Sequence, residues 1–250
     1  MTTSLSNNYN ATRDQLLTRA LRIVGAIGQG ETPSSTALTE AAQALNDLLY
    51  EWNTDGMDQW NLRVYTCSPL VAGTNSYTIG TGSTFNFPAP LKIFQAYLHD
   101  NTTGYDSPLI IIDWATYLQY SNKAQQGTPN QLVYKTPAAI GATGEMQGTI
   151  TLVLTPDTTT ANNKSLVIYG QKPFDDFDSS TNTLDFPPYW INALVWGVAA
   201  QLAYEYGVGL AERSMIAKKA DTHHEAALSF GTEEGSIYLQ PQPAWDGDGR

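Results

Sequence analysis

The chain combines 250 residues with a formal net charge of −11 and a hydrophobic content of 42%. A chain of this size can bury roughly 70–75% of its unfolded surface in one large domain or two small ones, and its composition excludes an intrinsically disordered protein. The negative charge argues against tight binding of nucleic acid, because proteins that bind nucleic acid tightly neutralise phosphates with many basic side chains.

Two amphipathic helices are predicted near the start of the chain. Apolar residues between positions 12 and 27 recur at the spacing of one helical face. A second run of this kind ends at Asp55, and Ser35 or Thr36 can cap its start. We expect the two helices to form an αα-hairpin with Gly28-Gln29-Gly30 in the turn. A phosphate-binding glycine loop would instead follow a strand or end in Gly-Lys-Ser/Thr.

Residues 62 to 168 show the periodicity and the Gly-, Pro- and Asn-rich connections of β-strands. The first predicted strand covers residues 62–67, and residues 77–79 are expected to be its partner across a turn. Asp113 is predicted to cap a short helix over residues 113–121. The other predicted strands cover residues 91–98, 109–112, 131–134, 149–154 and 166–169.

The most consistent helix pattern lies at residues 189–206. Pro187 and Pro188 suit the first turn of a helix, where backbone donors are unpaired in any case. The apolar and small residues that follow occupy more than one side, which indicates a helix that is buried on several faces. Gly207 suits the end of this helix, and a second periodic run begins at Leu210.

The predicted fold class is therefore α+β, since the strands are consecutive in sequence and helices flank them. We expect a helical bundle from residues 12–56 and 185–230, with an inserted antiparallel β domain at residues 57–184. Residues 231–250 are predicted to form a flexible, extended C-terminal tail.

The tail contains apolar residues that a flexible segment can use as anchors on a partner, namely Ile237, Tyr238, Leu239 and Trp245. The alternative interpretation is a disordered end with incidental aromatic residues. The sequence alone leaves both interpretations open.

No catalytic, cofactor-binding or metal-binding residues are predicted. His223 and His224 are adjacent, so they point about 100° apart on a helix and are interpreted as a surface pair. The single cysteine, Cys67, is expected to be a packed side chain within a strand. An enzymatic alternative is the hydrolysis of peptidoglycan by a carboxylate cluster. That cluster comprises Asp175, Asp176 and Asp178.

A series of short motifs along the chain resembles one protein family. In order, the motifs are GQGETP at residues 28–33, LNDLL at 45–49 with Trp52 and Gly56, PLVAG at 69–73 with SYTIG at 76–80, PL at 108–109 with IID at 111–113, TP at 128–129, Leu184 with FPP at 186–188, and AYEYG at 203–207. This order resembles the P22 gp4-like head-to-tail adaptor proteins of short-tailed phages, also called tail accessory or packaged-DNA stabilisation proteins. The Trp-Pro-x-Pro sequence usual after the fifth strand is reduced here to LVLTP at 152–156.

The resemblance implies a structural virion protein of the neck or tail, assembled in the host cytoplasm. It implies a ring, by analogy of twelve subunits, that joins the portal protein to the tail nozzle or hub protein. Such a ring extends the DNA channel and retains packaged DNA, with only transient, non-specific contact to double-stranded DNA. No membrane partner is expected, because no apolar run reaches the ~20 residues that span a bilayer.

Two surfaces follow from this interpretation. The tail anchors are predicted to bind the portal ring. Arg13, Arg19 and Arg22 form the one basic cluster of the N-terminal helix and are candidates for contacts with a neighbouring subunit or with the channel lumen.

Overall fold

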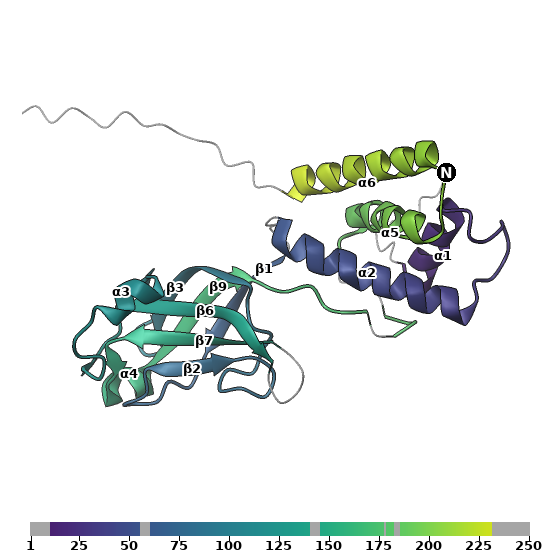
Figure 1. Cartoon of the computed structure of the whole chain (residues 1–250). Coiled ribbons are helices and arrows are strands. Elements are labelled where there is room, and N and C mark those ends of the chain that lie inside the picture. The colour runs from purple at the N-terminus through teal and green to yellow at the C-terminus, as the bar shows by residue number, and fades with distance from the viewer. Residues whose placement is uncertain (1–10, 56–60, 141–145, 178, 183–185, 232–250) are drawn as a thin grey trace, which may run out of the picture.

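The structure is a computed structural model that describes residues 11–55, 61–140, 146–177, 179–182 and 186–231 (Figure 1). It is a mixed α and β structure with one large curled sheet, as the α+β class requires. The long helices lie on one side, and the sheet with two short helices lies on the other (Figure 1). The chain passes from the long helices to the sheet and back again.

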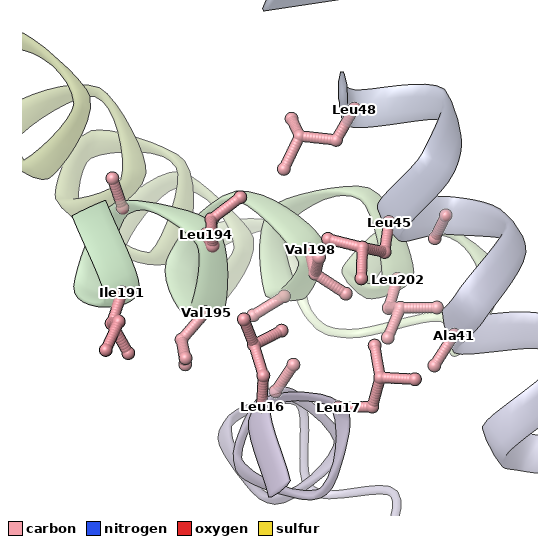
Figure 2. Close-up of a cluster of buried hydrophobic side chains, with 14 of the residues drawn as sticks. Leu16, Leu17, Ala41, Leu45, Leu48, Ile191, Leu194, Val195, Val198 and Leu202 are labelled. Atoms are coloured by element: carbon pink, nitrogen blue, oxygen red, sulfur yellow. The ribbon is translucent and has the colours of Figure 1, made fainter. Parts of the chain in front are cut away.

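Helix α5 (Ile191–Glu205) lies at the centre of the helical part. None of residues 193–203 is exposed, which confirms the prediction of burial on more than one side. Leu16 and Leu17 of α1 (Arg13–Ile23) approach α5 from one side, and Leu45 and Leu48 of α2 (Ser35–Asp55) approach from another (Figure 2).

Helix α6 (Leu210–Gly231) packs along α5 through small residues and aromatic contacts. A short 3-10 turn, η2 (Pro188–Trp190), precedes α5 and begins with proline, as the double proline predicts. All these elements contribute to one hydrophobic core, the helical core, which also contains Phe177 and Phe186 from the segment after the sheet.

The caps of the helices follow local chemistry. Thr12 and Gln15 form a capping box at the start of α1, where each side chain accepts from the other residue's backbone N–H. The cap of α2 is one residue earlier than predicted. The Ser34 hydroxyl accepts from the Ala37 N–H, because Ser35 is already the first helical residue.

Within the described residues, seven strands form one sheet in the order β1-β9-β3-β4-β6-β7-β2. A second, two-stranded sheet pairs β5 with β8. The strands are β1 (Leu62–Cys67), β2 (Ser76–Ile79), β3 (Lys92–Asp100), β4 (Asp106–Ile111), β5 (Gln126–Gly127), β6 (Gln131–Ile140), β7 (Met146–Val153), β8 (Thr155–Pro156) and β9 (Lys164–Gln171). Every strand of the large sheet contributes to a second hydrophobic core, the sheet core.

The sheet corrects two predictions. Strand β2 pairs with β7 and β1 pairs with β9, so the expected hairpin between β1 and β2 is wrong. The sheet is also not purely antiparallel, because β4 and β6 are parallel at Ile110↔Gln131 and Ile111↔Leu132. Parallel neighbours need a crossover connection. Helix α3 (Trp114–Leu118) and strand β5 lie within that connection.

The two short helices of the sheet region each begin at an aspartate. Asp113 caps α3 as predicted, and its side chain accepts from the Thr116 N–H at 3.1 Å. Asp157 caps α4 (Thr158–Asn163), which was not predicted. The Thr160 N–H lies 2.7 Å from the Asp157 carboxylate, and this hydrogen bond lowers the pKa of Asp157.

The helical core yields a stability prediction. Leu194→Ala on α5 and Leu45→Ala on α2 should each reduce the free energy of unfolding by about 2–5 kcal/mol, because each removes a fully buried side chain and leaves a cavity. Leu210→Ala is the matched control, since Leu210 is 81% exposed, and it should change stability by less than about 0.5 kcal/mol. Denaturant unfolding followed by circular dichroism measures all three. Unchanged midpoints for both core variants would contradict a shared core.

A second prediction tests whether the sheet unfolds independently of the helices, as the predicted domain boundaries imply. Cys67 is wholly buried in the sheet core, and burial raises the pKa of its thiol to about 12. A thiol reagent at pH 8 should therefore label native protein only when the sheet opens. Leu132→Ala in the sheet core should accelerate labelling, and Leu194→Ala should not. Equal acceleration by both variants would mean that the two cores open together.

Candidate functional surfaces

The basic cluster of α1 is divided between the interior and the surface. The Arg13 guanidinium lies 3.1 Å from the Asp14 carboxylate and donates to the Phe177 carbonyl oxygen at 3.4 Å. Arg19 and Arg22 are exposed instead. Arg13 therefore binds residues of its own chain. Arg19 and Arg22 remain as candidates for contact with another molecule.

An open hollow of about 490 Å³ lies on the outer side of α1 and is called the α1 hollow. Its lining comprises Ala11, Asp14, Gln15, Thr18, Arg19 and Arg22. Arg19 Nη2 donates to Asn192 Oδ1 at 3.3 Å, and Arg22 Nη2 donates to the Glu31 carbonyl oxygen at 3.5 Å. Neither guanidinium forms an ion pair within the part of the chain that the structure describes.

The outer side of α2 has the opposite charge. This α2 outer face contains no Lys or Arg, because α2 has none in its sequence. The face is defined by the exposed residues Glu40, Gln43, Asp47, Tyr50 and Glu51. The Tyr50 hydroxyl donates to the Asp176 carboxylate at 3.4 Å, and the charge of Asp176 raises the pKa of Tyr50.

The described residues of the proposed carboxylate cluster bind two different neighbours. Asp175 accepts from Lys172 Nζ at 2.6 Å, and Asp176 accepts from Tyr50. Asp178 lies outside the described residues. Both described carboxylates are exposed and serve contacts to neighbouring side chains.

Asp175 and Asp176 belong to the return segment, which leads from β9 to η2 and is described at residues 172–177, 179–182 and 186–187. Asn53 Oδ1 accepts from the Phe174 N–H at 3.1 Å, and Asn46 Oδ1 accepts from the Phe177 N–H at 3.2 Å. Asn46 and Asn53 lie seven residues apart on one face of α2. The return segment is therefore held along α2 by two side-chain amides, and Phe177 is inserted into the helical core.

His223 and His224 both contact tryptophan rings of neighbouring helices. The His224 ring stacks on Trp52 with ring centroids 4.5 Å apart, and the His223 ring lies 6.2 Å from that of Trp196. The interpretation of a surface pair is thus wrong, since both rings are half-buried and join α6 to its neighbours. Within the described residues, no group of three or more His, Cys, Asp or Glu could hold a metal ion.

An apolar surface remains exposed where β4 leads into α3. Ile110 is 63% exposed, Leu118 57% and Trp114 38%. Lys135 Nζ lies 3.5 Å from the centre of the Trp114 ring, a cation–π contact at the edge of this surface. Exposed apolar side chains gathered in this way are typical of protein contact sites.

The predicted tail anchors Ile237, Tyr238, Leu239 and Trp245 lie outside the described residues. The described chain ends with α6 at Gly231. Among the described helices, none combines the length and the apolar composition needed to cross a bilayer.

Comparison with known families decides the assignment. The model of the family described as SU10 adaptor protein matches residues 11–240. The chain belongs to the SU10 adaptor protein family. The match covers the helical core, the sheet and part of the tail region, so both structural parts of the chain lie within it. No curated protein matches the chain.

Membership of the SU10 adaptor family supports a structural role in a phage particle, in contact with other head or tail proteins. It agrees with the adaptor function implied by the motif order and favours it over the hydrolase alternative. The narrower P22 gp4-like assignment stays a prediction, because the matching family is named differently.

The return segment of this SU10 adaptor gives a further prediction. Asn46→Ala removes the acceptor for the part-buried Phe177 N–H and should cost about 1–3 kcal/mol of stability. Asn46→Asp retains an acceptor oxygen in the same place and should cost less. Urea unfolding and limited proteolysis within residues 172–182 measure the difference. Equal loss in both variants would show that the hydrogen bond does not hold the segment.

Proposed function

We propose that this protein is a head-to-tail adaptor of the P22 gp4-like kind, located in the neck of a phage particle. It forms a ring, by analogy of twelve subunits, between the portal protein and the tail nozzle or hub protein. The ring extends the DNA channel and retains packaged DNA. The family match across both structural parts of the chain is the observation that carries this proposal.

The division of the chain into helices and sheet supports a protein with two partners. Among the exposed apolar residues, Ile110 lies on β4 and Trp114 and Leu118 lie on the adjoining α3. Leu210 and Met215 lie on α6. Contact sites are thus available on both parts of the subunit. A subunit of this form can bind the portal through one part and the tail through the other.

The charge of the chain suits a channel through which DNA passes. The net charge of −11 means that acidic residues outnumber the basic residues that could neutralise phosphates. Contact with DNA is therefore transient and non-specific. Strong phosphate binding would oppose the movement of DNA during ejection. Retention of packaged DNA is then a matter of closing the channel rather than of affinity for DNA.

Electron microscopy of particles tests the proposal directly. In the phage that encodes this protein, loss of the protein should give DNA-filled heads that lack tails and lose their DNA. Added protein should restore a ring of density below the portal and protect the DNA from nuclease. Tailed, stable particles without the protein would contradict the proposal.

The tail is proposed to attach each subunit to the portal. Pro241 and Pro243 favour an extended chain, and Tyr238, Leu239 and Trp245 offer large apolar contacts at few positions. One tail binds weakly. In a ring, however, engagement of the first tail brings the others to high effective concentration, so modest individual affinities give firm attachment.

Deletion of residues 236–250 should therefore leave the fold intact and abolish joining to portal-bearing heads. Tyr238→Ala/Trp245→Ala should have the same effect in full-length protein, and Gln240→Ala/Gln242→Ala is the matched control that should bind normally. Co-sedimentation with tail-less heads measures binding. Normal attachment of the truncated protein would place the docking surface elsewhere on the subunit.

A further inference from the structure

The geometry points to a specific contact between subunits, and this inference rests on the proposed ring. We infer that the α1 hollow of one subunit binds the α2 outer face of the next copy, so that Arg19 and Arg22 meet Glu40 and Asp47. The partner is a second copy of this chain. Charge complementarity between the two surfaces carries the inference.

The α1 hollow has positive charge available for a partner. The Asp14 carboxylate that lines it lies 3.1 Å from the Arg13 guanidinium. Within the described part of the chain, an amide oxygen binds Arg19 and a carbonyl oxygen binds Arg22, and these neutral acceptors orient each guanidinium without neutralising it. Arginine retains donors in this situation because its guanidinium carries five N–H groups.

The α2 outer face presents carboxylates at a spacing that the arginine side chains of α1 can reach. Glu40 and Asp47 lie seven residues apart, about 10 Å along the helix. Arg19 and Arg22 lie about 4.5 Å apart along α1, and their long side chains extend the span over which they can bind carboxylates. Two helices can therefore lie against each other with both arginines near carboxylates.

The two surfaces differ, and this determines the type of assembly. Leu16 and Leu17 of α1 and Leu45 and Leu48 of α2 all point toward α5, so the outer sides of α1 and α2 face in different directions (Figure 2). A contact between unlike patches is head-to-tail, and it produces a ring when the rotation closes. Copies of a subunit with net charge −11 repel one another, and local pairing of opposite charges at the contact offsets that repulsion.

Charge reversal tests the contact. Arg19→Glu/Arg22→Glu makes both surfaces acidic, and Glu40→Lys/Asp47→Lys makes both basic. Each should raise the protein concentration for half-maximal ring formation more than ~10-fold, because like charges face each other. Native mass spectrometry in solution and the amount of adaptor bound per tail-less head measure assembly. Circular dichroism checks the fold, which exposed substitutions should not change.

Rescue separates this contact from a general effect of charge. All four changes in one chain restore the net charge and the complementarity, so rings should form as in the unchanged protein. A mixture of the two double variants should also assemble, with the variants alternating around the ring. Lys92→Glu/Lys218→Glu is the matched control for the arginine variant, because it lowers the net charge by the same amount at exposed positions on β3 and α6, and it should assemble normally.

Three outcomes would overturn the inference. The first is assembly of both double variants as efficiently as the unchanged protein. The second is failure of the fourfold variant and of the mixture. The third is normal rings of Arg19→Glu/Arg22→Glu that release packaged DNA, which would assign these arginines to the lumen. In the first and third cases the proposed ring stands. If the unchanged protein forms no ring on heads, the proposed function itself fails.

Discussion

Helix α5 has no exposed residue between positions 193 and 203, and the need to cover it organises the structure. Small side chains let the neighbouring helices approach closely. At Gly197 a Cβ atom would lie 2.6 Å from a Leu48 methyl carbon, so this position accepts a side chain only if Leu48 moves. Burial of an aliphatic side chain contributes roughly 1.5–3 kcal/mol. The buried side chains of α5 therefore contribute strongly to the stability of the helical core.

Covering α5 brings α1 and α2, which precede the inserted sheet, together with α5 and α6, which follow it. The outgoing and returning chains are bonded to each other beside the sheet, where the Lys172 N–H donates to the Asn61 carbonyl oxygen at 2.9 Å and the Asn61 amide donates to the Lys172 carbonyl oxygen at 2.6 Å. Asn61 is buried. The return segment then follows α2 to the helical core. The sheet is therefore connected to the helices by these hydrogen bonds as well as by the covalent chain.

Features that depend on neighbouring residues could be predicted from the sequence, and features that depend on distant residues could not. The start of α5 at a double proline and the aspartate cap of α3 are local, and both are found. The partners of β1 and β2 lie far along the chain, so the alternation of side chains could not identify them. Helix α4 has the sequence TTTANN, in which apolar residues do not recur at helical spacing. Its aspartate cap was the one feature of the sequence that indicated a helix there.

The candidate surfaces show the same limit. Helical period alone could have separated the arginines, since Arg13 lies on the side of Leu16 and Leu17, whereas Arg22 lies on the opposite side. The amide contacts of Asn46 and Asn53 join residues more than 120 positions apart, and no local pattern indicates them. The stacking of His224 on Trp52 is equally distant in sequence.

Because residues 193–203 of α5 are covered, the helical part of the described chain offers mainly the outer sides of α1, α2 and α6 for contact with another molecule. On α6 both signs of charge are interspersed, with Glu212, Lys218, Asp221 and Glu225 exposed along one helix. A surface with interspersed charges keeps the protein soluble and is not complementary to one charged partner. On α1 and α2 the signs are separated instead, basic on one helix and acidic on the other. Separation has no advantage for a subunit alone in solution, and it has a clear one where the basic surface of one copy faces the acidic surface of the next.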